Sequence, residues 1–121
     1  MKHTLEVFSG DKLVFYSDGK WLYPCFELEH FLATTEYESA TLTAHDKIVG
    51  RAAALLLIHL GIRNVVAGIM SGPGREALEY HQVKYGYESL VDQITCSTER
   101  ILMSEYDPRQ AYAILKERAR L

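Results

Sequence analysis

The sequence has 121 residues, of which 48% are hydrophobic, and its formal net charge is −3. This length fits a single domain over residues 1–121, and the hydrophobic content argues against a disordered chain. Without an excess of basic residues, the chain is a poor candidate for binding nucleic acid through its phosphates. We therefore expect one globular domain without a nucleic-acid partner.

The cysteines and the apolar runs of the sequence indicate the cellular compartment of the protein. Cys25 and Cys96 lie far apart and fit no metal or redox spacing, so we expect two reduced thiols. Charged residues interrupt the first twenty positions, which excludes a secretory h-region there. The longest apolar run, residues 52–58, is too short to span a bilayer. We expect a cytoplasmic protein that does not contact a membrane.

The first part of the chain predicts a hairpin and a helix. Leu5 and Val7 alternate with polar residues, residues 9–12 are typical of a turn, and the apolar run at residues 13–16 predicts a second strand. Pro24 suits the first turn of a helix that ends between residues 34 and 37. Residues 39–43 are a candidate for a short strand, and residues 44–46 for a loop.

The clearest predicted element is a helix over residues 47–60, because its apolar residues leave almost no polar face. Asp46 suits its N-cap and Gly61 its end. The apolar run at residues 65–70 predicts a central strand covered on both faces. The rest of the chain predicts a loop at residues 71–74, a helix at 75–84, a strand at 87–94, a short helix at 97–104 and a final helix at 108–120 capped by Asp107.

The predicted elements follow the order β-β-α-β-α-β-α-β-α-α. Alternation of strands and helices after residue 38 implies crossover connections and a mostly parallel sheet, with an antiparallel hairpin at one edge. The fold class is therefore α/β with a mixed sheet. In such sheets ligands bind beyond the carboxyl ends of the strands, where loops enter helices.

Two loops at such strand ends are candidates for a ligand site. At residues 71–75, Gly72 and Gly74 let the backbone approach a ligand, and free N–H groups at a helix start attract an anion. In the other loop, Lys47 and Arg51 are four residues apart, so on one helix face they would neutralise an anion. The alternatives are a structural turn and two cations that reach into solvent.

Two further residues at these loops, Asp46 and Gly50, each allow a structural and a functional interpretation. Asp46 is either a simple cap or an acceptor for a ribose hydroxyl, while Gly50 costs about 1 kcal/mol inside a helix unless a strand or ligand approaches closely. A helix terminus contributes about 0.3–1 kcal/mol to an exposed anion, whereas micromolar affinity needs about 8 kcal/mol. The ligand must therefore also bury area, as a nucleotide-like molecule does. Tyr80, Tyr85 and Tyr87 are either stacking partners or packing residues.

Three segments carry a resemblance to a known family. Residues 16–24 (YSDGKWLYP), residues 46–54 (DKIVGRAAA) and residues 71–74 (SGPG) resemble the family called domain of unknown function 1893, and the resemblance runs over most of the chain. It implies a cytidine deaminase-like fold, a three-layer α-β-α sandwich, without an assigned reaction.

The sequence departs from true deaminases at the metal ligands. Those enzymes open one helix with His-x-Glu or Cys-x-Glu and the next with Pro-Cys-x-x-Cys, which supply zinc ligands and a proton shuttle. Here Lys47 in His45-Asp46-Lys47 stands where the glutamate would be, and residues 71–74 contain no cysteine. Without these donors there is no basis for generating hydroxide at neutral pH. We therefore expect no metal, no cofactor and no zinc-dependent deamination.

The hypothesis favoured by these residues is a domain that binds a phosphate-containing, nucleotide-like small molecule at two helix N-termini. Glu105 lies in the closest match to a Cys-Pro-x-Glu-like piece of the family, without the cysteine, and either faces the site or lies in solvent. Two alternatives stay open: a metal-free enzyme on nucleotides with Asp46 or Glu105 as acid/base, and a protein-interaction module that forms a homodimer. The candidate ligand-binding residues are Asp46, Lys47, Gly50, Arg51, Ser71, Gly72, Gly74 and Glu105.

Overall fold

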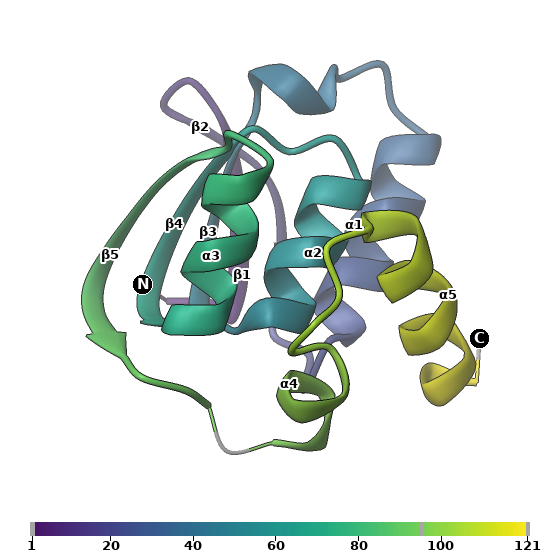
Figure 1. Ribbon diagram of the computed structural model, residues 1–121. Coiled ribbons are helices and arrows are strands. Elements are labelled where there is room, and N and C mark those ends of the chain that lie inside the picture. Colours follow the sequence, from purple (N-terminus) through teal and green to yellow (C-terminus); the bar gives the residue numbers. More distant parts are fainter. Residues whose placement is uncertain (1, 95, 121) are drawn as a thin grey trace.

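Five strands form one mixed sheet in the order β2-β1-β3-β4-β5 (Figure 1). The computed structural model describes residues 2–94 and 96–120. β1 pairs antiparallel with β2 and with β3, whereas β3, β4 and β5 run parallel to one another. The strands are β1 (Leu5–Ser9), β2 (Lys12–Ser17), β3 (Thr43–Val49), β4 (Asn64–Ser71) and β5 (Lys84–Val91).

Helices connect the strands and complete the chain in the order expected from the sequence. They are α1 (Tyr23–Ala33), the short 3-10 helix η1 (Ser39–Thr41), α2 (Arg51–His59), α3 (Gly72–Tyr80), α4 (Ser97–Ile101) and α5 (Pro108–Ala119). Asp107 caps α5 as predicted, since its side chain accepts a hydrogen bond from the backbone N–H of Arg109 at 2.9 Å. Over the part of the chain that the structure describes, no helix combines the length and the hydropathy needed to cross a bilayer.

The helices lie over one face of the sheet (Figure 1). The connections β2-α1-β3, β3-α2-β4 and β4-α3-β5 join parallel strands and advance in one direction along the sheet. Right-handed crossovers then place all three helices on the same side, and α5 packs on α2. Within residues 2–94 and 96–120 the chain therefore has two layers, and the second helical layer of the expected three-layer sandwich is not seen. β4 is central but uncovered on one face, where Ile69 is 40% exposed.

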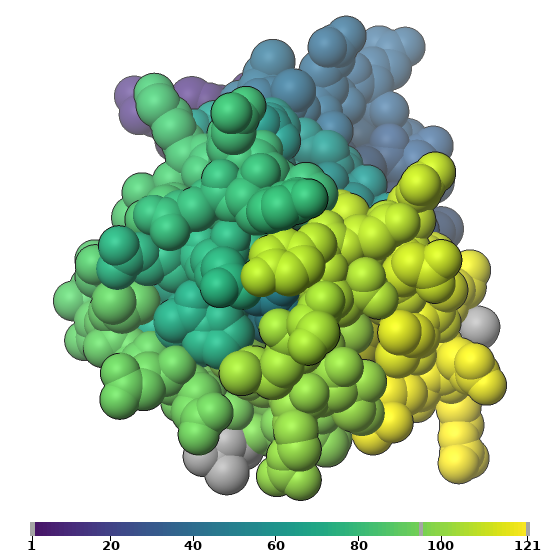
Figure 2. Space-filling view, viewed as in Figure 1, coloured from purple at the N-terminus to yellow at the C-terminus, as the bar shows by residue number. Residues whose placement is uncertain are grey.

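The core lies between the sheet and α2. Leu5 and Val7 of β1 are buried, and so is every residue of α2 from Arg51 to Leu57. This agrees with the prediction of a helix with almost no polar face. Ala111 and Leu115 of α5 are also buried, and α5 covers α2 from outside. Figure 2 shows the segments of α3 and of residues 101–119 packed side by side on this helical face.

The main error of the sequence-based prediction lies at residues 44–50. The expected loop at 44–46 is part of β3, and the helix begins at Arg51 rather than at Lys47. Asp46 is therefore not an N-cap; it pairs with Leu5 of β1 and with Ala67 of β4. Pairing on both sides of β3 outweighs the local helical spacing, and the β-branched Ile48 and Val49 suit a strand.

Smaller differences concern the neighbouring elements. The strand expected at 39–43 is replaced by η1 and the beginning of β3. The expected loop at 71–74 is the start of α3, because the Ser71 hydroxyl accepts a hydrogen bond from the Gly74 N–H at 3.0 Å and so caps the helix. β5 begins at Lys84 rather than at Tyr87, and the short helix after Cys96 ends at Ile101.

Gly74 permits the close contact between α3 and the end of β3, and its replacement by alanine tests this. A Cβ at this position would lie 2.8 Å from the Val49 carbonyl oxygen and 2.9 Å from the Gly50 carbonyl carbon. Since both are backbone atoms, we expect Gly74→Ala to destabilise the fold by about 1–3 kcal/mol in urea unfolding. Gly86→Ala is the control, because a Cβ there meets no atom within 4 Å. Equal stability of the two variants would contradict the close contact.

Candidate ligand-binding site

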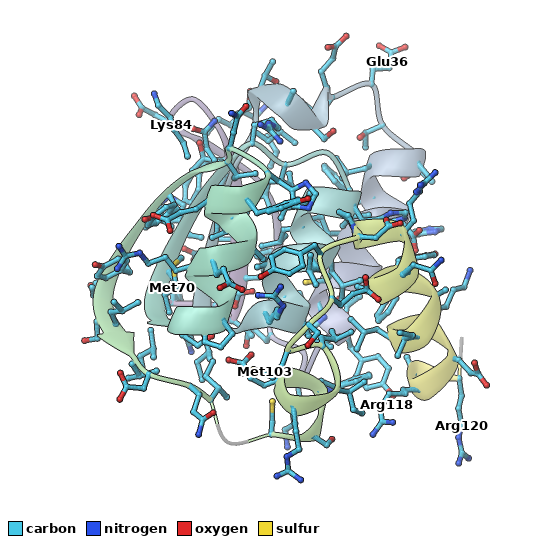
Figure 3. The ribbon with its side chains drawn as sticks, in the orientation of Figure 1. Glu36, Met70, Lys84, Met103, Arg118 and Arg120 are labelled. Carbon is cyan, nitrogen blue, oxygen red and sulfur yellow. The ribbon has the colours of Figure 1, made fainter. Side chains whose placement is uncertain are left out.

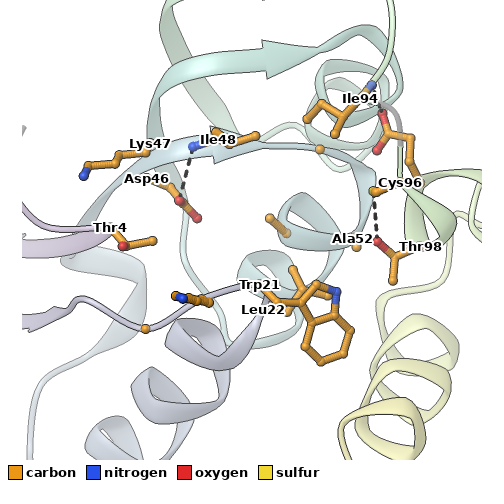
Figure 4. Close-up of a pocket in the computed structure, with 15 residues that line it drawn as sticks. Thr4, Trp21, Leu22, Asp46, Lys47, Ile48, Ala52, Ile94, Cys96 and Thr98 are labelled. Carbon is orange, nitrogen blue, oxygen red and sulfur yellow. Dashed lines mark hydrogen bonds between the residues drawn. The ribbon is translucent and has the colours of Figure 1, made fainter.

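A pocket of about 440 Å³ opens beside the first turns of α1 and α2 (Figure 4). Its walls come from the loop before α1, the end of β3, the start of α2 and the segment around α4. Several of these side chains are apolar. The residues that line it are Thr4, Gly19, Lys20, Trp21, Leu22, Asp46, Lys47, Ile48, Gly50, Ala52, Ala53, Ile94, Cys96, Thr98 and Glu99.

Asp46 supplies a buried carboxyl group to this pocket. It is only 7% exposed, and its Oδ1 accepts a hydrogen bond from the Ile48 N–H at 3.4 Å (Figure 4). Burial raises the pKa of Asp46 to about 7, although hydrogen bonds from the Ile48 and Lys47 backbone act to lower it. None of the ion pairs found among the described residues includes this carboxyl. Near neutral pH both protonation states are therefore populated, so Asp46 can donate or accept a hydrogen bond.

Cys25 lies in the first turn of α1 and is 3% exposed. Burial raises the pKa of its thiol well above the usual value, and the negative charge of Asp46 raises it further. The thiol is therefore neutral at physiological pH and serves as a small packing group. Both cysteines are free; Cys25 is buried, whereas Cys96 is exposed.

Glu99 of α4 holds the beginning of α2. Its side chain is almost fully buried, and its carboxylate accepts hydrogen bonds from the Arg51 N–H at 2.6 Å and from the Ile94 N–H at 3.4 Å. Gly50 is the N-cap of α2, and a Cβ there would lie 2.6 Å from Oε2 of Glu99. Gly50 therefore lies before the helix rather than inside it, and the close neighbour that requires a glycine is a carboxylate of the chain itself.

The first turn of α2 also exposes backbone donors to the pocket. Ala52 and Ala53 line it, and their N–H groups have no hydrogen-bond acceptor within residues 2–94 and 96–120. Such N–H groups at a helix start favour a negatively charged or carbonyl group of a ligand. The pocket therefore offers the Asp46 carboxyl group and two neighbouring N–H donors, while its second carboxyl group, that of Glu99, already accepts hydrogen bonds from Arg51 and Ile94.

Trp21 and two lysines lie at the rim. Trp21 has a φ of 56°, in the left-handed region that non-glycine residues rarely adopt, and its ring meets Tyr23 edge-on at 5.3 Å between centroids. Its side chain is 43% exposed, so one face of an aromatic ligand could stack on it. Lys20 also lines the pocket, and Lys47 extends away from Asp46 (Figure 4).

Arg51 does not have the role expected from the sequence. Because Lys47 is on β3, the two cations do not share a helix face. The Arg51 side chain is fully buried, and its guanidinium lies over the Tyr106 ring at 4.5 Å. It donates to the Pro73 carbonyl at 2.9 Å, to Glu76 Oε1 at 2.8 Å and to the Glu105 carbonyl at 2.9 and 2.6 Å. These bonds tie α2 to α3 and to the segment before α5, so the guanidinium is not free for a phosphate.

The other predicted residues gather around Arg51 rather than in the pocket. Ser71 and Gly74 form the capped start of α3, and a Cβ on Gly72 would lie 3.0 Å from the Asp92 carbonyl oxygen. The Glu105 carboxylate accepts from the Asp107 N–H at 3.1 Å. The structure thus brings Asp46, Lys47 and Gly50 to one pocket and places Arg51, Ser71, Gly72, Gly74 and Glu105 in a structural cluster beside it.

Some pocket residues were missed by the sequence reasoning. Glu99 and Thr98 are buried, and the Cys96 thiol lies 3.2 Å from the Thr98 hydroxyl (Figure 4). Glu99 is 48 positions from its partner Arg51, and no local pattern links them. Trp21 lies inside the segment 16–24 and was the one missed residue with a visible signal. The tyrosines considered for stacking do not line the pocket; Tyr85, for example, donates to Glu79 at 2.6 Å.

The fold and pocket define an α/β protein with a mixed five-stranded sheet and a pocket at the start of two helices. The chain belongs to the family described as TM1506, domain of unknown function (DUF1893), whose family profile matches residues 7–119. This confirms the resemblance seen in the sequence. No group of three or more His, Cys, Asp or Glu side chains that could hold a metal ion is found among the described residues.

A solved structure supports the fold. The crystal structure of a DUF1893 family protein (TM1506) from Thermotoga maritima superposes with a TM-score of 0.83 at 22% sequence identity. The match covers 95% of this chain and 80% of that one. A likeness at this identity shows the shared fold. No curated protein matches the chain.

The pKa of Asp46 predicts a pH dependence of stability. Its value of about 7 in the folded protein lies above the ordinary 3.8, so the folded state holds the proton more tightly. The resulting stability is fully present below about pH 4 and is lost as the pH rises through 7. Relative to Asp46→Asn, the wild type should lose a few kcal/mol between pH 4 and pH 8, at about 1.4 kcal/mol per pKa unit. Urea unfolding of both proteins across this range measures it, and parallel profiles would contradict it.

The Arg51 cluster predicts a large loss of stability on substitution. Arg51→Met would leave the carbonyls of Pro73 and Glu105 without their buried donor, so we expect a loss of at least about 3 kcal/mol. Arg109→Met is the matched control, because the Arg109 side chain is 84% exposed. Chemical unfolding compares the two. A loss no greater than that of the control would show that Arg51 is not a structural residue.

Proposed function

We propose that this domain binds a small nucleotide-like molecule, with its base inside the pocket and its phosphate at the rim. The observation that carries the proposal is Asp46, a buried carboxyl without a cationic partner among the described residues, in a pocket of about 440 Å³. This volume lies within the range of about 300–1,000 Å³ typical of small-molecule sites. A buried polar group facing a cavity gains most from a ligand that completes its hydrogen bonds.

The pocket walls favour a flat, partly apolar group such as a nucleobase. Leu22, Ile48 and Ile94 offer apolar contacts, and Trp21 at the rim offers an aromatic face. Stacking and burial together supply the area that an isolated anion lacks. Asp46 would then bond to the N–H donors on the edge of the base.

The phosphate is assigned to the rim. Lys20 and Lys47 contribute positive charge there, and the N–H groups of Ala52 and Ala53 belong to the start of α2, which lines the same space. This pair of features replaces the Lys47 and Arg51 pair expected from the sequence. A helix terminus contributes only about 0.3–1 kcal/mol at an exposed site, so the base must supply much of the affinity.

We also propose that the fold is of the cytidine deaminase-like type. The strand order β2-β1-β3-β4-β5 and a pocket at the starts of two neighbouring helices support this placement.

A second candidate function, a metal-free enzyme acting on nucleotides, is favoured by one observation. The pKa of Asp46 is raised by burial to about 7, which suits a general acid or base at neutral pH.

Calorimetric titration with the four ribonucleoside monophosphates and their nucleosides tests binding. We expect at least one nucleotide to bind, and Asp46→Asn to weaken it by about 10-fold or more through the loss of a charge-assisted hydrogen bond. The double variant Lys20→Ala with Lys47→Ala should weaken the nucleotide but not its nucleoside, and should reduce the salt dependence.

The matched control for the lysines is Lys84→Ala, since Lys84 is exposed at the start of β5 and lines no part of the pocket (Figure 3). Chromatography of the same mixtures separates binding from catalysis, because only an enzyme yields a product. Failure of every nucleotide and nucleoside to bind, or equal binding by Asp46→Asn, would refute the proposal.

A further inference from the structure

The face of the sheet opposite the helices carries a shallow hollow of about 580 Å³. It extends over β1, β3, β4 and β5, and the residues that line it include Glu6, His45, Lys47, Val66, Gly68 and Glu88. Sheets built from parallel strands are normally covered on both faces. Here the central strand β4 leaves Val66 partly exposed and Ile69 40% exposed. This face therefore resembles a surface that is covered by another protein molecule.

Two opposite charges lie at the same level of this face. Lys47, Gly68 and Glu88 occupy the positions between the paired residues Asp46, Ala67 and Tyr87 and the paired residues Ile48, Ile69 and Ser89, although they form no register pairs themselves. Neighbouring strands are about 4.8 Å apart, which separates the backbones of Lys47 and Glu88 by about 10 Å. No ion pair joins the two side chains among the described residues. A cation and an anion thus stand on either side of a glycine.

We propose that two copies of this chain pack sheet against sheet across this face, about a two-fold axis that runs along β4. Such an axis exchanges β3 and β5, so Lys47 of each copy lies opposite Glu88 of the other. Sheets pack about 10 Å apart, a distance that extended lysine and glutamate side chains together span. The pattern is complementary to itself, as an isologous interface requires.

The next row of residues fits the same axis. His45 pairs with Val66 and Val66 with Gly86, so the axis places Val66 against its own counterpart and His45 opposite Gly86 of the second copy. A Cβ at Gly86 would meet no atom within 4 Å, so space for an imidazole is present there. Large and small side chains therefore oppose each other across the axis.

An axis along β4 sets three strands of each copy, β3, β4 and β5, against one another. Their projected area is about 330–380 Å² before side-chain relief is counted. Specific interfaces bury about 800 Å² of accessible surface per partner, so we expect a dimer of modest affinity. This arrangement uses the opposite face of the sheet and shares Lys47 with the proposed nucleotide site, so Glu88→Lys, which lies outside that site, tests the dimer independently of nucleotide binding.

Charge reversal tests the arrangement by sedimentation velocity. The chain mass of 13.8 kDa makes a dimer of 2 × 13.8 = 27.6 kDa, which we expect for the wild type at micromolar concentration. Lys47→Glu alone and Glu88→Lys alone should each raise the dissociation constant at least about 10-fold, because like charges then face each other. Both residues are exposed, and circular dichroism checks that each variant is folded.

Mixing the two single variants is the decisive step. In a mixed dimer, the glutamate introduced at position 47 of one copy would face the lysine introduced at position 88 of the other. The unaltered Lys47 and Glu88 would also face each other, so both ion pairs are restored. We expect the one-to-one mixture to dimerise about as well as the wild type.

Glu36→Lys is the control for the charge reversals, since Glu36 is exposed on the loop after α1 (Figure 3). This variant changes the net charge as Glu88→Lys does, but it should leave the dimer intact. A monomeric wild type, a dimer indifferent to the reversals at positions 47 and 88, or a mixture that stays monomeric would each overturn the proposal.

Discussion

The architecture depends on two buried charges at the beginning of α2. Glu99 binds the backbone N–H of Arg51, while the guanidinium of the same residue binds Glu76 and two backbone carbonyls. A buried ion is costly unless its hydrogen-bonding groups are satisfied, and here both ions are. Since α2 is the helix on which α3 and α5 pack, this junction fixes the position of the whole helical layer over the sheet. It also sets one wall of the pocket.

This use of Arg51 decides what the pocket can recognise. A guanidinium engaged by protein acceptors adds little to the binding of a phosphate, so the polar groups left for a ligand include the Asp46 carboxyl, two N–H groups of α2 and the lysines of the rim. A site of this kind selects for hydrogen-bond donors at its floor and for negative charge at its edge. The sequence already predicted a ligand that buries area besides its charge, but it assigned the positive charge to Lys47 and Arg51, whereas the structure leaves Lys20 and Lys47 at the pocket.

The sequence predicted the order of the elements, the hairpin, the burial of α2 and the cap at Asp107, because each depends on local spacing or turn chemistry. It failed at residues 44–50, where the strand is stabilised by pairing with β1 and β4. Gly50 was a local indication against a helix that begins at Lys47, because a glycine inside a helix costs about 1 kcal/mol. In the structure Gly50 lies before the helix. Glu99 had no local signal, since its contact with Arg51 arises only when α4 folds back against α2.

Strand alternation at β3 places the two proposed surfaces one residue apart. The Asp46 carboxyl is buried in the pocket on the helical side, whereas the next residue, Lys47, lines both the pocket and the hollow on the open face. The Lys47 ammonium group cannot form full ion pairs with a phosphate at the rim and with Glu88 of a second copy at the same time. If both proposals hold, each event therefore weakens the other, and linkage requires the effect to be equal in both directions. A nucleotide that loosens the dimer and a dimer that loosens nucleotide binding would then have a single physical origin, the competition for Lys47.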